Sequence, residues 1–199
     1  MKILITRCYR TLSSHTYITL VFFYPEARML LIGVLWQSKS LFKYKYAVLF
    51  CIKWITREHA KVDRIACPWL IKNFVDKDSE FFFVPAHKVI QLAKEQNAIP
   101  FDVPNAELGH HGDECSFDAI IKKYHLDKKE PKLLELAKIV RGADTPNRAL
   151  TPQSEGLVAI ATGFSLTSKD DHDNMAKQCY VYDALLAYCK SDKDTSSRH

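Results

Sequence analysis

The sequence predicts an α+β domain that is mainly helical, with about five or more helices and two or three short strands. Many apolar residues recur three or four positions apart, which is typical of helices with one buried face. Only two short stretches have the apolar run or the alternation that is typical of strands. Serine, threonine, proline and glycine stand where helices usually begin and end. These three observations together favour helices packed around a small sheet.

The first half of the predicted domain combines helices with the two short strands. Pro68 suits the first turn of a helix, because its missing N–H needs no partner there. Residues 81–84 form an apolar run that predicts a short buried strand, and a helix is predicted over 86–96. Residues 99–103 alternate between apolar and other residues and include a proline, which favours an edge strand.

The second half predicts four helices, each with apolar residues at every third or fourth position. Ser116 can cap the first of these helices, and Pro131 and Pro152 suit the first turns of the second and third. Gly142 suits the end of the second helix. The predicted spans are 116–124, 131–142, 152–163 and 170–189.

Charge is distributed unevenly along the 199 residues, whose formal net charge is +5. Residues 1–53 hold eight lysine or arginine residues and one acid, Glu26, which makes their net charge +7. Residues 54–199 hold the other 20 basic and 22 acidic residues and therefore have a net charge of −2. No basic stripe remains on the predicted domain to contact a phosphate backbone, so the sequence has no strong nucleic-acid signal.

The chain is predicted to have three parts. Residues 1–53 are an atypical basic and apolar extension, residues 54–190 are the domain, and residues 191–199 are a polar tail expected to be disordered. The apolar run 29–36 has eight residues, whereas a bilayer span needs roughly 20, so no transmembrane segment is expected. The extension has three alternatives: a membrane-surface anchor, a strand-forming part of the domain, or a segment outside the native fold. An over-extended start of translation would explain the third.

The six cysteines indicate a reduced, cytoplasmic protein, because none of them forms a C-x-x-C pair. Cys67 is a candidate redox thiol, since the start of a helix lowers the pKa of a thiol. Burial beside Trp69 would instead make this thiol inert, and the sequence leaves both alternatives open.

Carboxylate and imidazole side chains predict a divalent metal site. The candidate ligands are Asp63, Glu107, His110, Asp144 and His172. Glu107 and His110 are three residues apart, and nearby glycines indicate a loop that can bring both to one ion. His111 is the alternative to His110. Such ligands favour Mn, Fe or Zn over the metals of thiolate sites.

Two arginines are candidate anion-binding residues. Arg64 and Arg141 are always charged, and their fork-shaped donors suit a small oxyanion such as chromate, sulfate or phosphate. Asp63 directly precedes Arg64, and Asp144 is three residues after Arg141; both can orient these arginines or bind a metal. The competing interpretation is that these pairs are helix caps and cross-links between elements. No phosphate-binding glycine loop or G-x-S-x-G elbow is present, so nothing indicates a nucleotide enzyme or a serine hydrolase.

From about residue 54 to residue 190, the chain resembles the C-terminal domain family of the chromate-resistance protein ChrB. The blocks that carry the resemblance are Trp54-Ile55-Thr56-Arg57, Asp63 to Ile71, Ile99-Pro100-Phe101-Asp102, Gly112 to Asp118, Arg141-Gly142-Ala143-Asp144 and Tyr182-Asp183-Ala184-Leu185. The resemblance implies a bacterial domain associated with chromate tolerance, a stress response, and it implies no particular chemistry.

The leading hypothesis is a chromate-resistance domain with a metal or oxyanion site that carries out redox or detoxifying chemistry. The first alternative is a regulatory module that senses chromate. The second is a non-catalytic interaction domain, in which the polar clusters are caps and ion pairs. The sequence does not decide whether the protein is an enzyme.

Overall fold

The chain divides into two units, Met1–Cys51 and Ile52–His199. The computed structural model describes residues 8–12, 15–24, 29–38, 41–49 and 51–191. The predicted tail therefore lies, from residue 192 onward, outside the described residues. Side chains are described from Cys51 onward, so the first unit is known by its strands alone.

The first unit contains one antiparallel sheet with the strand order β1-β2-β3-β4. Its strands are β1 (Cys8–Leu12), β2 (His15–Tyr24), β3 (Met29–Ser38) and β4 (Leu41–Leu49). Among the three alternatives for residues 1–53, the strand-forming part of the domain is the one that expects strands. The choice among those alternatives, and the predicted division of the chain at residue 54, stay predictions.

The second unit confirms the prediction of a mainly helical α+β fold. Its described residues form seven α-helices and a sheet of three short strands. The strands are β5 (Lys53–Arg57), β6 (Glu80–Val84) and β7 (Ile99–Pro100). The helices are α1 (Asp63–Phe74), α2 (Val89–Gln96), α3 (Ser116–Lys123), α4 (Leu126–Lys129), α5 (Leu133–Asp144), α6 (Pro152–Thr167) and α7 (Asp171–Ser191). Among the described helices, none has both the length and the apolar character that a membrane crossing requires.

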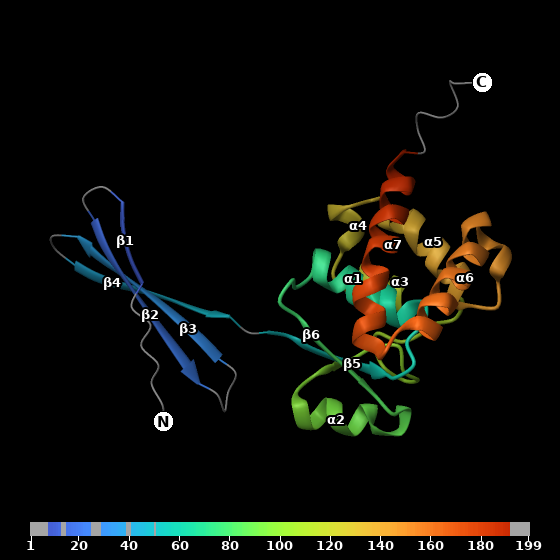
Figure 1. Ribbon diagram of the computed structural model, residues 1–199, viewed down its shortest axis with the longest axis horizontal. Coiled ribbons are helices and arrows are strands. Elements are labelled where there is room, and N and C mark those ends of the chain that lie inside the picture. The colour runs from blue at the N-terminus through green and yellow to red at the C-terminus, as the bar shows by residue number, and fades with distance from the viewer. Residues whose placement is uncertain (1–7, 13–14, 25–28, 39–40, 50, 192–199) are drawn as a thin grey trace. The chain divides into compact units, whose positions relative to one another are not determined.

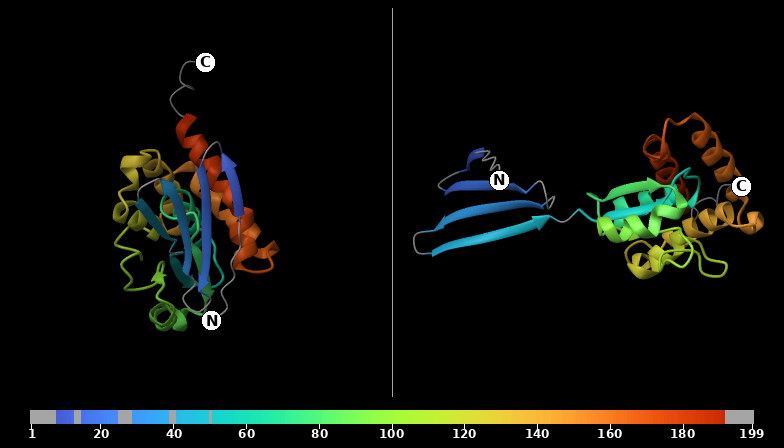
Figure 2. Two further views of the ribbon diagram at one scale, coloured as in Figure 1. Left: turned by 90° about the vertical axis from the view of Figure 1, so that its left-hand side faces the viewer. Right: turned by 90° about the horizontal axis from the view of Figure 1, so that it is seen from below.

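The three strands are parallel and lie in the order β6-β5-β7. Each connection between them contains a helix, as parallel pairing requires. Successive residues of β5 point to opposite faces, so Trp54 joins the main hydrophobic core while Ile55 packs in a smaller cluster with residues of α2. Accordingly, α2 lies on one side of the strands and the other helices lie on the other side (Figure 1). Figure 2 shows this arrangement from two further directions.

Trp69 stands at the centre of the helical side. Its ring stacks on Phe117 of α3, with centroids 6.4 Å apart, and contacts Tyr182 of α7 at 5.9 Å. Its indole Nε1 donates a 2.8 Å hydrogen bond to Asp183. Because all three rings are almost fully buried, α3 and α7 are held at fixed positions against the middle of α1.

Two predicted boundaries are wrong, and the backbone geometry shows why. Helix α1 begins at Asp63 rather than at Pro68, which lies inside the helix, because the amides of Ile65 and Ala66 already bond to the Val62 carbonyl. The predicted strand over 99–103 contains only the two residues of β7. The chain turns away at Asp102, whose φ of 48° is left-handed.

The later helices differ from prediction mainly at their ends. Ser116 is the first residue of α3 rather than its cap, and Cys115 occupies the cap position. Helix α5 continues past Gly142 to Asp144, and α6 continues past Gly163 to Thr167. The two extra residues of α5 matter because they place Asp144 beside the start of α1.

Candidate metal centre

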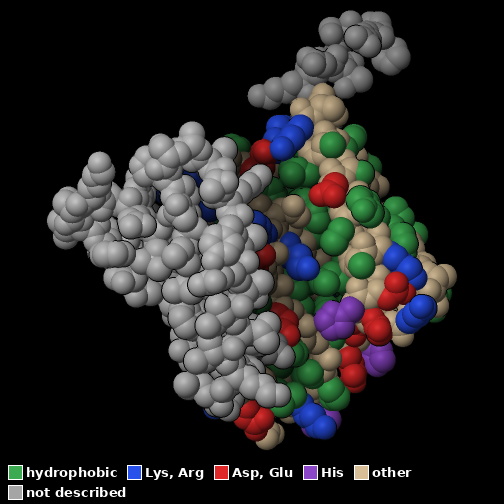
Figure 3. Space-filling model, turned by 60° about the vertical axis from the view of Figure 1, so that its left-hand side comes forward, with side chains coloured by type: hydrophobic (Ala, Val, Ile, Leu, Met, Phe, Trp, Pro, Cys, Tyr) green, Lys and Arg blue, Asp and Glu red, His purple; other side chains and the backbone are tan. Residues whose placement is uncertain are grey.

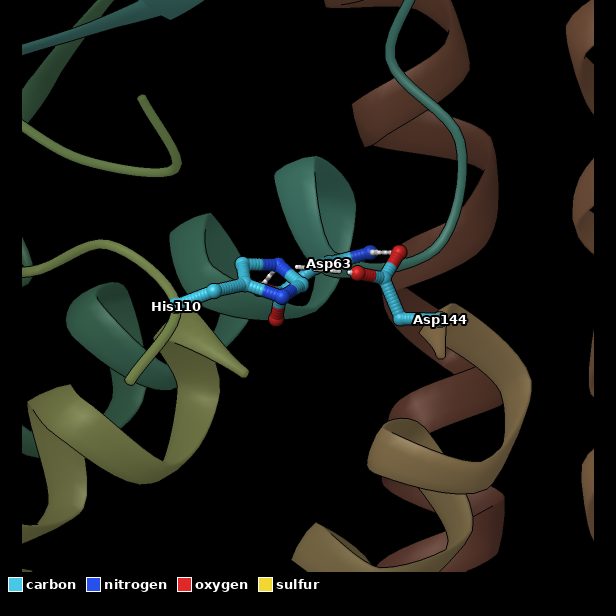
Figure 4. Close-up of side chains that lie close together, drawn as sticks. All are labelled: Asp63, His110 and Asp144. Atoms are coloured by element: carbon cyan, nitrogen blue, oxygen red, sulfur yellow. Dashed lines mark hydrogen bonds and ion pairs between the residues drawn. The ribbon is translucent and has the colours of Figure 1, made fainter. Parts of the chain in front are cut away.

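A polar cluster lies beyond the carboxyl ends of β5 and β7, where parallel sheets commonly place their sites. Asp63 is the first residue of α1, Asp144 is the last residue of α5, and Asp102 follows β7. His110 comes from the loop between β7 and α3. Figure 4 shows its imidazole ring pointing between Asp63 and Asp144.

Three carboxylates converge on a single nitrogen of His110. Its Nε2 lies 3.1 Å from Asp144 Oδ2, 3.2 Å from Asp102 Oδ1 and 3.6 Å from Asp63 Oδ2. One ligand atom from each of Asp63, His110 and Asp144 lies within 4.8 Å of the others. One N–H can serve only one of the three oxygens well, so the imidazole alone leaves this group of acids incompletely neutralised.

Asp63 is the most deeply buried member of the cluster. Its side chain is 1% exposed, and its oxygens accept hydrogen bonds from the backbone N–H groups of Ser116 at 2.7 Å and Phe117 at 3.1 Å. It therefore caps α3 from another helix, since the first N–H groups of a helix have no partner within it. Burial raises the pKa of Asp63 to about 6.

Two arginines hold Asp102. Arg57 Nη2 lies 3.0 Å and Arg64 Nε lies 3.2 Å from Asp102 Oδ2. Burial opposes ionisation of Asp102, but the hydrogen bond with His110 and the two guanidinium charges outweigh burial and lower its pKa. Hydrogen bonds with Asp102, Asp144 and Asp63 raise the pKa of His110 to about 12. A metal ion that binds His110 must therefore replace a proton there.

Arg141 belongs to the rim of the cluster. Its Nε and Nη2 bond to the two oxygens of Asp118 at 3.0 and 2.6 Å. Asp118 also accepts the Cys115 backbone N–H at 3.1 Å, at the start of α3. Both predicted anion-binding residues, Arg64 and Arg141, thus have a carboxylate partner.

Two hollows open on either side of His110. One has a volume of about 460 Å³ and is lined by residues that include Asp144, Arg141 and Asn147. The other has a volume of about 350 Å³ and is lined by Arg57 and Asp102 among others. The cluster is therefore buried on the Asp63 side and accessible from the His110 side, where the imidazole is 39% exposed.

The family of ChrB C-terminal domains matches residues 54–189 of this chain. The chain belongs to this family. The match confirms the resemblance that the sequence blocks indicate. Protein ChrB from Cupriavidus metallidurans is one relative, 28% identical over 141 residues. The aligned part is 71% of this chain and 42% of that protein, so the chain spans less than half of the relative's length. No solved structure matches the chain.

In this ChrB-family domain the structure brings together three of the five predicted ligands, Asp63, His110 and Asp144. It does not bring Glu107 to them. The Glu107 side chain is 73% exposed and pairs with Lys123, because the loop turns between Glu107 and His110. His111 points away as well, with its Nε2 2.8 Å from the Glu107 carbonyl oxygen. The choice between the neighbouring histidines is therefore His110.

His172 also lies apart from the cluster. Its ring meets the edge of Phe83, with centroids 5.2 Å apart, at a separate hollow of about 390 Å³. Figure 3 shows histidine and acidic side chains close together on one face of the second unit. The neighbouring Asp171, rather than His172, contacts the chain segment that leads to Asp63.

Cys67 does not have the environment of a redox thiol. It is the fifth residue of α1 and is fully buried, so the start of the helix does not act on it directly. Burial, followed by the charge of Asp63, raises the pKa of Cys67 well above its usual value. Its sulfur lies 3.4 Å from Asp63 Oδ1 and donates to it. Of the two alternatives that the sequence leaves open for Cys67, this environment favours the inert thiol.

Sequence reasoning missed Asp102, Asp118 and Arg57 as members of the network. The alternation over residues 99–103 makes Asp102 a polar residue of the predicted edge strand, although an acid just after a strand of a parallel sheet is a usable signal. Asp118 stands three residues after Cys115, which is the spacing of a capping pair and indicates only a helix start. The last residue of β5, Arg57, offers no local signal, because its partner lies 45 residues away.

Gly109 sets the path of the loop that carries His110. A Cβ atom at this position would lie 2.6 Å from the Val103 carbonyl oxygen and 3.1 Å from that of Ala106. We expect Gly109→Ala to destabilise the domain by about 1–3 kcal/mol through this overpacking and to move His110 out of the cluster. Urea denaturation measures the first effect. Gly163→Ala is the control, since a Cβ there meets nothing within 4 Å, and it is expected not to destabilise the domain. An unchanged stability of Gly109→Ala would contradict this account.

Proposed function

We propose that this ChrB-family domain binds one divalent cation and that the loaded centre serves chromate resistance. The ligands are Asp63, His110 and Asp144, with Asp102 as the fourth side chain next to the ion. The observation that carries the proposal is the convergence of three carboxylates on one imidazole nitrogen. A cation at that point replaces a single shared proton and neutralises more of the acidic charge.

The spacing of the oxygen and nitrogen atoms supports this proposal. Metal–ligand bonds of about 2.1 Å in a tetrahedral or octahedral arrangement separate neighbouring ligand atoms by about 3.0–3.4 Å. The distances of 3.1, 3.2 and 3.6 Å around His110 Nε2 come close to this spacing before any ion is added. Carboxylate oxygens with one imidazole favour Mn, Fe or Zn.

The two hollows beside His110 support a centre with open coordination positions. A structural metal site is closed by protein ligands, whereas a centre that acts on other molecules keeps positions for water or a ligand. Here the hollow of about 460 Å³ reaches both His110 and Asp144. A small molecule that enters it can therefore reach an ion held by these two side chains.

The charge balance of the network around His110 favours a small oxyanion as the molecule that enters this hollow. The charged side chains of the network are Asp63, Asp102, Asp118, Asp144, Arg57, Arg64, Arg141 and His110. Four carboxylates balance three guanidinium groups and the protonated imidazole, so the metal-free network is neutral. A divalent cation that replaces the imidazole proton makes the network positive by one charge. Chromate thus binds the loaded centre and not the metal-free one.

The neighbouring thiols do not support reduction of chromate at this centre. Burial raises the pKa of Cys67 and of Cys115 above that of an ordinary thiol, so both stay protonated. We therefore propose binding of chromate at the metal, which suits either a sensing module or a step of detoxification by another group. Release of a chemically altered chromium species separates the second role from the first.

Metal loading of the full chain tests the proposal. The protein is purified without an affinity tag, stripped with a chelator and titrated with Mn²⁺, Zn²⁺ and, without oxygen, Fe²⁺. We expect close to one tightly bound ion per chain, and chromate binding by calorimetry in the loaded form only. A folded protein that binds none of the three ions would overturn the metal centre and leave the interaction domain as the better hypothesis.

A further inference from the structure

The segment between β5 and α1, residues 58–62, leads directly to Asp63 and is held by side chains of α7. Both oxygens of the Asp171 carboxylate accept backbone N–H groups of this segment, at 2.9 Å from His59 and 2.7 Å from Ala60. Asp171 is the first residue of α7, where the helix dipole favours a negative charge. One carboxylate thus accepts hydrogen bonds from two consecutive backbone N–H groups that lie 112 and 111 residues earlier in the sequence.

Two further residues on the same face of α7 hold the carbonyl groups of this segment. Asn174 Nδ2 donates to the Ala60 carbonyl at 2.8 Å, and the Tyr182 hydroxyl donates to the Val62 carbonyl at 2.9 Å. Asn174 and Tyr182 are buried, and Gln178 between them orients the Asn174 amide through a short hydrogen bond. The face of α7 therefore fixes both the donors and the acceptors of the segment.

The backbone of this segment is strained where Asp171 holds it. His59 has a φ of 59°, a left-handed conformation that is unfavourable for a residue with a side chain. Its side chain is 90% exposed, so packing of the imidazole does not explain the conformation. The hydrogen bonds of Asp171 compensate for the strain and keep the turn in one shape.

This turn determines where Asp63 stands. The Val62 carbonyl, held by Tyr182, is also the acceptor of the first amides of α1. The Glu58 carbonyl accepts Arg64 Nη1 at 2.8 Å, and Arg64 in turn contacts Asp102. A change in the turn therefore moves Asp63 and Arg64 together relative to His110 and Asp144, which come from other elements.

We propose that Asp171 is a positioning residue of the metal centre, acting through the main chain of residues 58–62 on the Asp63 carboxylate. This inference rests on the proposed metal centre. Asp171 touches none of the ligands, and its function is to keep Asp63 at the distance at which it and His110 share one ion. Loss of a group that orients a ligand typically weakens metal binding about 10–100-fold.

The test is the affinity of the full-length Asp171→Asn protein for Mn²⁺ and the visible spectrum of its Co²⁺ complex. The side-chain oxygen of asparagine can accept a hydrogen bond from one of the two N–H groups. Its NH₂ group is a donor and therefore faces the other N–H without forming a hydrogen bond. We expect a Kd for Mn²⁺ that is about 10–100-fold weaker, and a changed Co²⁺ spectrum at saturation. The spectrum separates positioning from stability, because a loss of stability alone leaves the loaded centre unaltered.

The matched control is Asp173→Asn, which removes the same charge from the same helical turn. Asp173 pairs with Lys177 and makes no contact with residues 58–62, so we expect wild-type affinity and spectrum. If Asp171→Asn does not fold, Tyr182→Phe is the second variant. It removes the hydroxyl that donates to the Val62 carbonyl and is expected to weaken Mn²⁺ binding several-fold.

The outcomes separate this inference from the metal centre itself. A wild-type chain that binds no metal contradicts the centre and the inference together. A folded Asp171→Asn protein that binds Mn²⁺ as tightly as wild type and has the same Co²⁺ spectrum overturns the inference alone. If Asp171→Asn cannot be folded, a Tyr182→Phe protein with wild-type Mn²⁺ affinity and Co²⁺ spectrum also overturns the inference.

Discussion

His110→Ala is expected to abolish divalent-metal binding while the domain stays folded. The imidazole nitrogen is the point on which Asp63, Asp102 and Asp144 converge, so its removal takes away a ligand and the centre of the cluster. Loss of an outer partner costs about 10–100-fold in affinity, and loss of a ligand is expected to cost more than about 100-fold. Titration with Mn²⁺, followed by calorimetry, measures the effect.

Two variants of the same loop are the controls for His110→Ala. His111→Ala removes the neighbouring imidazole, and Glu107→Ala removes a carboxylate that is 73% exposed and pairs with Lys123. Both are expected to bind Mn²⁺ as wild type does. Equal losses in all three variants would show that the loop as a whole, and not the His110 ligand, is responsible. Wild-type affinity of His110→Ala would contradict the assignment of the site.

Asp63→Ala is expected to lower the free energy of unfolding of the metal-free protein by about 2–4 kcal/mol. The substitution leaves the backbone N–H groups of Ser116 and Phe117 buried without their acceptor, at a cost of about 1–3 kcal/mol each. Removal of a buried carboxylate whose pKa is raised to about 6 offsets part of this loss. Urea denaturation at neutral pH with a chelator present measures the difference.

Asp144→Ala distinguishes the two roles that the structure gives to Asp63. Asp144 is 21% exposed, and its one hydrogen bond to backbone, from the Asp63 N–H, is 3.3 Å long. We expect this variant to lose metal binding as Asp63→Ala does, but to lose only about 1 kcal/mol of stability or less. Equal destabilisation by the two substitutions would contradict the assignment of Asp63 as the cap of α3.

Local sequence patterns were sufficient for the fold class and for part of the site. The spacing of apolar residues predicts helices because it places them on one face, and this information lies within each segment. The same holds for the Thr151–Pro152 start of α6, which the structure confirms. Asp63, His110 and Asp144 were candidates because acids and imidazoles beside apolar runs are unusual wherever they occur.

By itself, the sequence determined the mainly helical α+β class, the ChrB family and three of the residues that meet at the cluster. Only the tertiary structure decided that Asp102 joins them, that Glu107 and His172 do not, and that Cys67 is buried. The physical reason is the large sequence separation between the residues that are in contact. Asp63 caps a helix 53 residues away and Asp171 holds a turn 111 residues away, and no local periodicity encodes which distant partners will meet.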